Sequence, residues 1–551
     1  FWLKKYNPMA PSPWHVATFV AIVAQAVASQ VEEAAFELSP EAGASFDPAS
    51  VSSLCSKESL KGISVVVVGG GIGGLYAAYT LVKCGITNVT VLEKEARLGG
   101  KLLTEFRTTK GAHCKPDGLR DCFPIELGAI QLYPQTAALA RELGLPCHYA
   151  EYHNQDFVDM TGSQLFHATD WRHWMAGHLR DPHSAKLPKF LEAIKSTVQV
   201  DIEIAKMVEQ VTNIVGFDGA YRWPPPVNES LWEEMGKSCT TFLRERGLQK
   251  SEALFRLVTA PFGYGFIEHV PALYCLGIMG EHIREMEDQR LMPCFLQIGG
   301  SISLIDSMAK HLVESGVRIH TSADVYHITR HLEDATAPVE VFARIPNASD
   351  TLHIVADALV LAVPLDVGSS PILSDMTHTE IEYRLSYVTW MASTTVFTWP
   401  KGRQAVHGVG LPILNMNSNR TRHIHLGPCQ NHGDLFVVYQ YGEDPVTNAT
   451  GLDLDRKLRE DLHLLWGADP ADINVVDQYI WPTYNTHIRG ASIARGMPWS
   501  WFDQQGTSKT VHVGQASSFE VMHMIIEQIQ QLWHHGKIDA LLRRNGKARF
   551  V

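Results

Sequence analysis

A glycine-rich segment near the start of the chain constrains the fold more than any other feature of the sequence. Residues 65–68 are four consecutive valines, the composition of a strand that is buried on both faces. The glycines that follow have the spacing G-x-G-x-x-G: Gly69, Gly71 and Gly74. Residues 75–82 continue with the apolar pattern of a helix, and a β-branched strand over 89–92 ends at Glu93. The order of these elements predicts a βαβ unit.

The three glycines have separate steric roles in such a unit. The first permits a sharp turn, the second lets the backbone approach a pyrophosphate, and the third lets the helix pack close to the strand. The helix N-terminus supplies free N–H groups and a partial positive charge for phosphates. Glu93 stands where a carboxylate accepts hydrogen bonds from ribose hydroxyls. Because all these parts occur in order, the segment predicts a dinucleotide site rather than a purely structural glycine turn.

The residues after Glu93 indicate which dinucleotide is bound. Residues 95–104 read E-A-R-L-G-G-K-L-L-T, and residues 125–129 read I-E-L-G-A. Both resemble the flavin-containing amine oxidoreductase family, which includes the monoamine, polyamine and L-amino acid oxidases. There an R-x-G-G-R-type loop and a D/E-L-G-A/G segment wrap the ribose, pyrophosphate and isoalloxazine of FAD, and plain NAD enzymes lack them. The resemblance therefore implies FAD.

The resemblance continues toward the C-terminus and covers residues 62–535. Residues 299–306 resemble the family's G-G-x-x-x-L segment, and residues 358–364 resemble its D-x-V-V-x-A-x-P strand. Residues 510–520 read T-V-H-V-G-Q-A-S-S-F-E, where most members have a G-E/D-x turn before a helix that faces the flavin's ribityl chain and pyrophosphate. The residues that the resemblance places against FAD are Gly69, Gly71, Gly73, Gly74, Glu93, Lys94, Arg97, Gly100, Lys101, Gly128, Ala129, Val325, Gly514 and Gln515.

The fold implied by the resemblance is α/β, with a Rossmann-like FAD-binding domain of the glutathione-reductase type interleaved with a mixed α+β substrate domain. A chain of 551 residues is also too long for one ordinary core. Residues 150–290 have mainly helical patterns with many aromatic residues. We assign 61–150, 291–365 and 480–535 to the FAD-binding domain, 151–290 and 366–479 to the substrate-binding domain, and 536–551 to a C-terminal tail.

Two departures from the family bear on the chemistry. Gln131 falls where L-amino acid oxidases place an arginine that grips the substrate carboxylate, and glutamine cannot supply a charged bidentate grip. Its side-chain amide either contacts the substrate or forms hydrogen bonds with the nearby backbone. Many members also place a lysine, linked to oxygen reactivity, beside flavin N5, but residues 387–399 contain none. The use of O2 as electron acceptor is therefore open.

Aromatic residues shortly before the C-terminal segment are candidates for the family's substrate cage, in which π faces favour amines and cations. We select Tyr484 and Trp499, whose alternative role is packing in the core. Covalent attachment in monoamine oxidases uses a cysteine near the C-terminal segment, and none follows Cys429, so we expect noncovalent FAD. His269, His327 and His487 are possible bases, but their spacing does not select one.

The bulk composition excludes some functions. The net charge of −12 gives no general attraction for nucleic acid, and no long Lys/Arg run is present. No Cys/His cluster has metal-ligand spacing, so we expect no metal. Nine cysteines lie without C-x-x-C spacing, of which Cys114 and Cys122 flank a loop and would pair in an oxidising compartment.

The N-terminal segment predicts a signal peptide over 1–28. Residues 16–28 are apolar, too short for a membrane span, and end in the A-x-A sequence of Ala26 to Ala28. The alternatives are a membrane anchor or a mis-joined exon. Residues 29–60 have the composition of a flexible leader. Secretion would permit glycosylation at five N-x-S/T sequons: Asn88, Asn228, Asn347, Asn419 and Asn448.

The sequence therefore predicts an FAD-dependent oxidoreductase that dehydrogenates a small amine-type substrate by hydride transfer to flavin N5. With O2 as acceptor the by-product is H2O2. The alternatives are a flavin dehydrogenase or oxidative cyclase, a prenyl- or polyene-directed oxidase of the same fold, and a redox-inert FAD-binding protein. The sequence identifies neither the substrate, nor the acceptor, nor the oligomeric state.

Overall fold

The computed structural model places part of the chain well enough to describe. The described residues are 62–108, 110–115, 122–129, 132–149, 155–158, 164–168, 206, 210, 223–252, 255, 259, 264–287, 294–296, 299–334, 336–346, 351–365, 372–400, 421–425, 435–442, 446–447, 450–484, 486–519 and 521–546. All of them belong to one unit of contacts, 47–216 with 221–551. The predicted signal peptide, the leader and Gln131 lie outside the described residues.

A five-stranded parallel sheet forms the centre of the part assigned to FAD binding. Its strands, in spatial order, are β20 (Thr510–His512), β13 (Ala358–Leu361), β1 (Val65–Val68), β2 (Val89–Leu92) and β9 (Arg318–His320). All residues of β1, β2 and β13 are buried, as expected for strands covered on both faces. The predicted βαβ unit is confirmed, with α3 (Ile72–Lys83) between β1 and β2.

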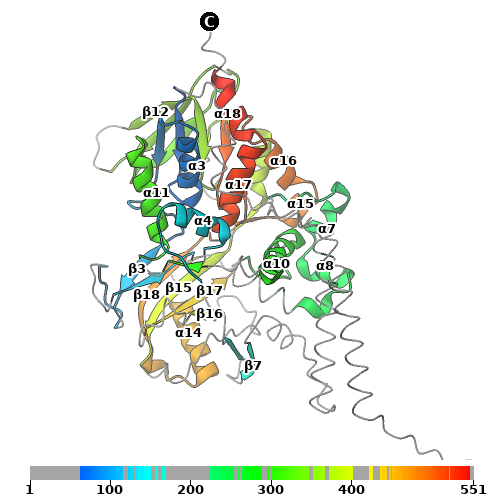
Figure 1. Ribbon diagram of the computed structural model, residues 1–551. Helices are drawn as coiled ribbons and strands as arrows, with labels where there is room; N and C mark the ends of the chain where they lie inside the picture. The colour runs from blue at the N-terminus through cyan, green and yellow to red at the C-terminus, as the bar shows by residue number, and fades with distance from the viewer. Residues whose placement is uncertain are drawn as a thin grey trace, which may run out of the picture. The chain divides into compact units, whose positions relative to one another are not determined.

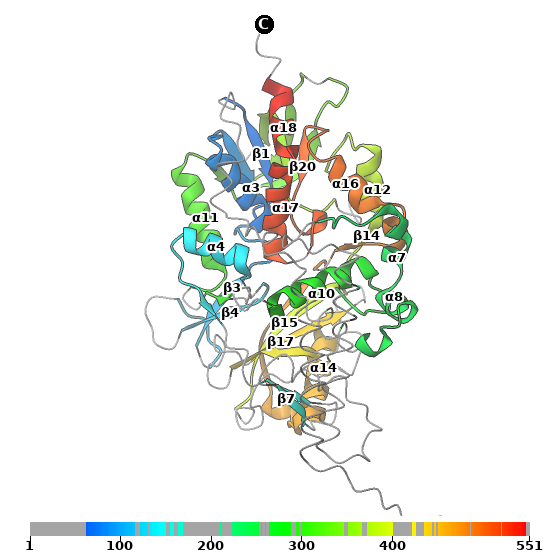
Figure 2. The same ribbon diagram turned by 45° about the vertical axis from the view of Figure 1, so that its right-hand side comes forward.

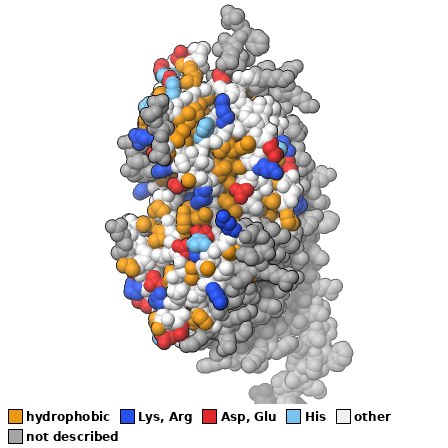
Figure 3. Space-filling view, turned by 90° about the vertical axis from the view of Figure 1, so that its left-hand side faces the viewer, with side chains coloured by type: hydrophobic (Ala, Val, Ile, Leu, Met, Phe, Trp, Pro, Cys, Tyr) orange, Lys and Arg blue, Asp and Glu red, His pale blue; other side chains and the backbone are white. Residues whose placement is uncertain are grey.

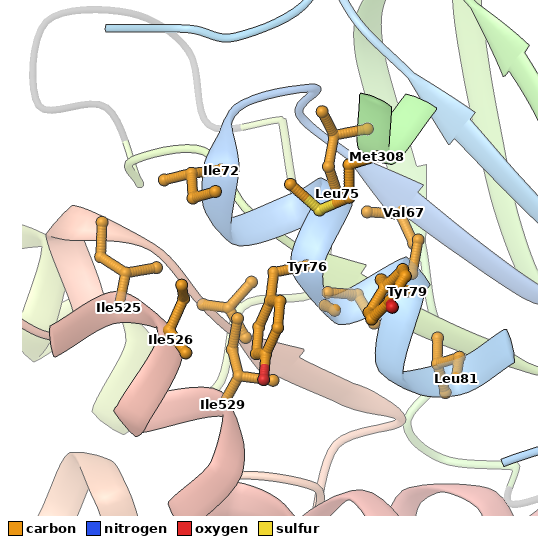
Figure 4. Close-up of a cluster of buried hydrophobic side chains, with 14 of the residues drawn as sticks. Val67, Ile72, Leu75, Tyr76, Tyr79, Leu81, Met308, Ile525, Ile526 and Ile529 are labelled. Carbon is orange, nitrogen blue, oxygen red and sulfur yellow. The ribbon is translucent and has the colours of Figure 1, made fainter. Parts of the chain in front are cut away.

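Two helices from distant parts of the sequence pack beside α3. These are α11 (Ile302–Glu314) and α17 (Met522–His534), and both lie next to α3 in Figure 1. Figure 4 shows Tyr76 of α3 directed toward Ile526 and Ile529 of α17, within a single buried hydrophobic cluster. The cluster continues into α18 (Lys537–Gly546), where Leu541 and Leu542 are fully buried. The start and the end of the chain therefore share one core.

A three-stranded antiparallel sheet follows, made of β10 (Asp324–Thr329), β11 (Val339–Arg344) and β12 (Leu352–Ala356). A buried ionic group connects it with the parallel sheet. The guanidinium of Arg330 binds both carboxylate oxygens of Glu380 in α12 (His378–Ser386), at 2.6 and 2.7 Å. Nε2 of His512, in β20, lies 2.9 Å from the same carboxylate. Burial alone raises the pKa of Glu380, but hydrogen bonds from His512 and Arg330 outweigh it and hold the pKa well below its usual value.

The second sheet is antiparallel and lies in the part assigned to substrate binding. Its strands, in spatial order, are β16 (Thr421–His425), β17 (Leu435–Gly442), β15 (Met391–Thr398) and β18 (Asn474–Trp481). Helix α14 (Thr450–Trp466) packs against one set of its side chains, which includes Phe397 and Phe436. A second cluster joins Val396 and Tyr439 of the sheet to Leu127 of the segment that resembles the family's FAD-binding motif. The two parts of the molecule are therefore packed on each other through this segment.

The remaining elements are mostly short. They are β3 (Thr104–Arg107), β4 (Phe123–Glu126), α4 (Pro134–Glu142), β5 (His148–Tyr149), β6 (Gln155–Val158), β7 (Gln164–Ala168), η2 (Glu229–Leu231), α7 (Trp232–Gly236), α8 (Cys239–Glu245), η3 (Gln249–Ser251), α10 (Ala272–Glu287), β8 (Cys294–Phe295), β14 (Tyr387–Val388), η5 (Pro470–Asp472), β19 (His487–Ile488), α15 (Gly490–Ile493), α16 (Met497–Asp503) and η6 (Gln515–Ser517). Helix α16 lies beside α12 (Figure 2).

Three disulfides connect described residues. The predicted pair Cys114–Cys122 is confirmed. Cys147–Cys294 joins two segments that lie 147 residues apart in the sequence, and Cys239–Cys275 joins α8 to α10.

Some sequence expectations differ from the structure. The predicted tail at 536–551 is wrong for Lys537–Gly546, which form α18, because Ile538, Leu541 and Leu542 give this segment an apolar face that packs in the core. The helix expected directly after Gly514 begins only at Met522. Residues 155–168, expected in a helical region, include the antiparallel strands β6 and β7.

The surface and helices add two observations. On the face in Figure 3, acidic and basic side chains of the described residues are interspersed rather than separated into broad fields. Among the helices in the described part of the chain, none combines the length and the apolar character needed to cross a bilayer.

Candidate flavin and substrate site

The glycine-rich turn brings the two ends of the fold into contact. A Cβ atom built on Gly74 would lie 1.9 Å from the carbonyl oxygen of Gly69, so only glycine permits the observed approach of helix and strand. A Cβ on Gly73 would lie 2.9 Å from Cα of Gly514. A Cβ on Gly71, by contrast, would meet nothing closer than 3.8 Å, the distance to Cα of Gly100. The turn is therefore closed around Gly73 and Gly74 and open at Gly71, where the fingerprint places a pyrophosphate.

Glu93 organises the turn and the adjoining strands. One carboxylate oxygen accepts the N–H of Gly70 at 2.6 Å, and the other accepts the N–H of Glu95 at 2.8 Å. Its carbonyl oxygen accepts the N–H of Ala323, just before β10, which carries the predicted adenine contact Val325. Lys94 is exposed. The carboxylate thus lies at the tip of β2 beside the turn, as the fingerprint requires of a ribose acceptor.

Arg97 shapes the loop that follows. Its guanidinium donates to three carbonyl oxygens of the same loop, those of Leu98, Gly100 and Leu102, at 2.8 to 3.3 Å. The N–H of Gly99 bonds to the carbonyl oxygen of Gly70 at 2.8 Å and holds the loop against the glycine turn.

Gly128 closes the loop from the other side. A Cβ on Gly128 would lie 1.8 Å from the carbonyl oxygen of Lys101, and the N–H of Ala129 bonds to that oxygen at 3.3 Å. The segment 125–129 therefore packs directly on the loop, as the resemblance implies.

Lys101 connects this loop to the C-terminal half of the site. Its ammonium donates to the side-chain oxygen of Gln515 and to the carbonyl oxygen of Tyr484, and Gln515 donates to the same carbonyl. The ammonium also lies 4.7 Å from the ring centroid of Tyr484. Gly514, with a φ of 94°, makes the turn that carries Gln515. Four of the predicted residues, Lys101, Tyr484, Gly514 and Gln515, thus come together from distant parts of the sequence.

Trp499 lies in a different environment. Its indole N–H donates to the carbonyl oxygen of Pro225 at 2.8 Å, and its ring stacks on that of Trp232 with centroids 4.8 Å apart. These contacts attach α16 to α7 and to the segment before it. The structure places Tyr484 beside Lys101 and Trp499 beside Trp232, so the two predicted cage residues have separate sets of neighbours.

Glu126 is a buried acid that the sequence prediction did not select. It accepts the hydroxyl of Thr104 at 2.7 Å and the N–H of Ser301, at the start of α11, at 2.7 Å. Burial raises the pKa of Glu126 to about 7, and the hydrogen bonds from Ser301 and Thr104 offset only part of this effect. Its position in the E-L-G-A motif was the available signal, but that motif was assigned only to flavin contacts.

A cluster of aromatic side chains adjoins the C-terminal segment, and only one of its members, His487, was named as a candidate from the sequence. Its members are Trp223, Tyr264, Tyr274, Trp390, His487 and Phe519, and we call it the aromatic cluster. The ring centroids of Tyr274 and Phe519 lie 5.2 Å apart, and those of Tyr274 and His487 lie 5.4 Å apart. Phe519 follows Gly514 closely in the sequence, and the carbonyl oxygen of Trp390 accepts the N–H of Tyr484 at 2.7 Å. The cluster is therefore attached at two points to segments that are predicted to bind FAD.

The structure distinguishes the three candidate histidines. His487 is buried in the aromatic cluster, whereas His269 is exposed and His327 lies on β10 near Thr329. Burial, together with the charge of Arg489, lowers the pKa of His487 to about 3. His487 is therefore an uncharged group at neutral pH.

One group of acidic and histidine side chains in the described part has atoms close enough to hold a metal ion: Glu105, His113 and Asp477. The guanidinium of Arg107 already binds both carboxylates, at 2.6 Å to Glu105 and 2.5 Å to Asp477. A permanent cation thus compensates these acids.

Comparison with known proteins decides the family. Residues 72–422, more than half of the chain, match the profile of the flavin containing amine oxidoreductases. The chain belongs to this family. Its residues fit FAD, because the turn is open for a pyrophosphate only at Gly71 and Glu93 stands beside it, where a ribose carboxylate is expected.

Proteins with different names resemble this chain. The polyenoic fatty acid isomerase of Ptilota filicina is 24% identical over 306 residues, which are 52% of this chain and 55% of that protein, so the match spans about half the length of this curated relative. The crystal structure of a CLA-producing fatty acid isomerase from P. acnes superimposes with a TM-score of 0.64 at 17% identity, covering 87% of this chain and 99% of that one. Putrescine oxidase bound to putrescine gives a TM-score of 0.59 at 15% identity, covering 87% and 98%. Cyclohexylamine oxidase from Brevibacterium oxydans gives a TM-score of 0.58 at 17% identity, and the match covers 87% of this chain and 99% of that one. At these identities the structural matches show a shared fold.

Proposed function

We propose that this protein is an FAD-dependent enzyme that moves a double bond along an unsaturated, largely apolar chain. FAD, when bound, supplies a hydride acceptor that can also return the hydride. The net conversion is an isomerisation, so it consumes no external oxidant. The substrate class is that of the polyene-directed oxidase among the sequence-based alternatives, but the reaction, a net isomerisation, was not predicted from the sequence.

The observation that carries the proposal is the chemical character of the aromatic cluster. Its six residues present aromatic faces and no acidic group, and the one titratable base among them, His487, is neutral because of its burial. Such surroundings favour an apolar chain, whereas an ammonium group would find π faces but no carboxylate partner there. The names of two similar proteins, both fatty acid isomerases, support the same substrate class.

The amine-type substrate remains the second candidate. Its support is the likeness in fold to putrescine and cyclohexylamine oxidases. In that case a hydride leaves the carbon beside nitrogen, and the electrons pass to O2 with release of H2O2 or to another acceptor. Against it stands the ring of Tyr484, the predicted π surface for an amine, because the ammonium of Lys101 already lies 4.7 Å from its centroid.

In the proposed enzyme the described residues have two tasks. The turn at Gly71, the carboxylate of Glu93, and the segment at Gly514 and Gln515 hold the cofactor noncovalently. With FAD bound, the aromatic cluster would exclude water and contact the apolar chain.

The test is an anaerobic substrate panel on the purified yellow protein. Linoleic acid should give a conjugated diene, followed by ultraviolet absorbance and chromatography, while the flavin stays oxidised at the end of the reaction and no peroxide forms in air. Amines of similar size should leave the flavin spectrum unchanged. Lasting bleaching by an amine, with peroxide on re-aeration, would instead establish the amine oxidase. No response to either class would leave a redox-inert flavoprotein.

We also infer that the chain folds in an oxidising compartment, consistent with the predicted secretion. The support is the three disulfides among the described residues, because cytosolic proteins rarely keep such bonds.

A further inference from the structure

Two buried polar atoms in the aromatic cluster lack hydrogen-bond partners within the described part of the chain. They are Nε1 of Trp390 and Nδ1 of His487. The side chains are 4% and 3% exposed, and their rings lie 6.1 Å apart at an interplanar angle of 24°. Buried polar groups are nearly always paired, so two neighbouring exceptions at one place need a ligand or another explanation.

The surrounding structure holds both rings in place. A Cβ on Gly265 would lie 2.4 Å from the indole of Trp390, so the ring rests directly on this backbone. His487 belongs to β19, which pairs with β14, and the next residue, Ile488, donates its N–H to the hydroxyl of Tyr274 at 2.8 Å. The two nitrogen atoms are therefore presented by fixed groups and not by mobile side chains.

The pair also lies next to the cofactor-binding residues. The carbonyl oxygen of Trp390 accepts the N–H of Tyr484, and the carbonyl oxygen of Tyr484 accepts hydrogen bonds from Lys101 and Gln515. One residue thus separates the pair from the segments that bind FAD.

The chemistry of the two groups selects an oxygen acceptor. A tryptophan N–H only donates, and neutral His487 offers a second donor in the tautomer that carries its proton on Nδ1. The positive charge of Arg489 is near enough to influence His487 and favours an anion over a cation at this place. In the tautomer with the proton on Nδ1, neither of the two nitrogen atoms accepts a hydrogen bond, so an ammonium group, which only donates, has no hydrogen-bond partner in this pair.

We propose that Trp390 and His487 bind an oxygen atom of the substrate's carboxyl group and so fix which end of the apolar chain lies in the aromatic cluster. The proposal rests on the proposed function, because it assumes an apolar chain that ends in a carboxyl group. It also supplies a carboxyl-binding site that does not depend on Gln131, where L-amino acid oxidases have arginine.

The test measures binding to the FAD-loaded protein with two saturated probes of equal chain length, dodecanoic acid and dodecylamine. Binding is followed by the change in the flavin absorbance spectrum. Wild-type protein should prefer the acid. Trp390→Phe removes one N–H and keeps an aromatic ring, and it should weaken acid binding about three- to tenfold, the range for a single neutral hydrogen bond. It should leave binding of the amine unchanged.

Two further variants separate the hydrogen bond from packing. His487→Leu should weaken acid binding by a similar factor, whereas His487→Asn, whose amide N–H is near the position of Nδ1, should retain it within about twofold. Trp399→Phe makes the same change as Trp390→Phe in the core beneath α14 and should bind both probes as wild type does. Flavin content and melting temperature identify any variant that fails to fold. In that case the two conservative single variants, Trp390→Phe and His487→Asn, decide whether the pair binds the carboxyl group.

The outcomes for the pair and for the proposed function are distinguishable, because the saturated probes bind without reacting. If Trp390→Phe weakens both probes equally, or neither, the proposed carboxyl site is wrong even when the wild-type protein isomerises linoleic acid. If acid binding alone is weakened but no polyunsaturated chain is isomerised, the carboxyl site stands and the proposed reaction fails.

Discussion

The glycines of the dinucleotide turn are required for different reasons. The structure shows this through the atoms that a methyl group would contact at each position. At Gly74 it would collide with the carbonyl oxygen of Gly69 at 1.9 Å. At Gly71 the nearest atom is 3.8 Å away, and the backbone there is extended, with a φ of −77°, which any residue adopts. Gly74 is therefore required by the protein fold itself, whereas Gly71 is required only by a bound cofactor.

This difference gives a prediction for two alanine variants. Gly71→Ala should keep the melting temperature of the cofactor-free protein but lower FAD affinity at least about tenfold, because the methyl group occupies the approach of the pyrophosphate. Gly74→Ala should lower both the melting temperature and the FAD affinity, since helix α3 can no longer pack on β1. The measurements are thermal denaturation of the apoprotein and titration with FAD. Full FAD affinity in Gly71→Ala would place the pyrophosphate elsewhere.

At the scale of elements, side chains from one segment accept hydrogen bonds from the backbone at the start of another. Helix α11 begins against Glu126 and Thr104, which come from β4 and β3. The carboxylate of Glu126 accepts the N–H of Ser301, and the hydroxyl of Thr104 accepts the N–H of Ile302. These bonds satisfy groups that a helix N-terminus leaves open. The arrangement joins the hairpin β3–β4 to the parallel sheet's helical layer.

The raised pKa of Glu126 predicts a pH dependence of stability. Below pH 4.5 this carboxyl is protonated in the folded and unfolded states, and between pH 4.5 and about 7 the folded state keeps a proton that the unfolded state releases. The free energy of unfolding should therefore fall by about 3 kcal/mol over this range, at about 1.4 kcal/mol per unit. Glu126→Gln should lack this fall. Urea unfolding of both proteins at pH 4.5 and pH 8 measures the change. If the free energies of unfolding of Glu126→Gln and wild type differ by the same amount at the two pH values, the prediction is wrong.

At the scale of the whole molecule, contacts and covalent bonds connect parts that are distant in the sequence. Gly73 touches Gly514, and α17 shares a core with α3. The disulfide Cys147–Cys294 holds together two segments separated by 147 residues, whereas Cys114–Cys122 closes a separation of only 8. A long closed loop restricts the unfolded chain more than a short one.

The disulfides are therefore expected to contribute unequally. Replacing Cys147 and Cys294 by alanine should lower the free energy of unfolding by about 2.5 kcal/mol more than the same change at Cys114 and Cys122, from the logarithmic dependence on loop length. Chemical denaturation of the two double variants and the wild type measures this difference. Equal losses would indicate that the chain-entropy account does not apply to this protein.

The sequence by itself determined the βαβ unit, the FAD loop and the C-terminal turn. These depend on short-range rules: buried strands require β-branched runs, and close approaches of backbone require glycine, so Gly69 to Gly74 and Glu93 could be assigned without coordinates. The sequence predicted the connection of Lys101 with Gln515 only in part. The family resemblance placed both residues against the cofactor but did not predict their contact with each other.

The tertiary structure alone decided the rest of the site. The aromatic cluster takes its six residues from separated segments, and Trp390 and His487 have no sequence spacing that links them. The burial that lowers the pKa of His487 and raises the pKa of Glu126 is a property of packing and not of either residue. Local sequence fixes the conformation of a segment, but the distance between segments depends on how all their side chains fill one core.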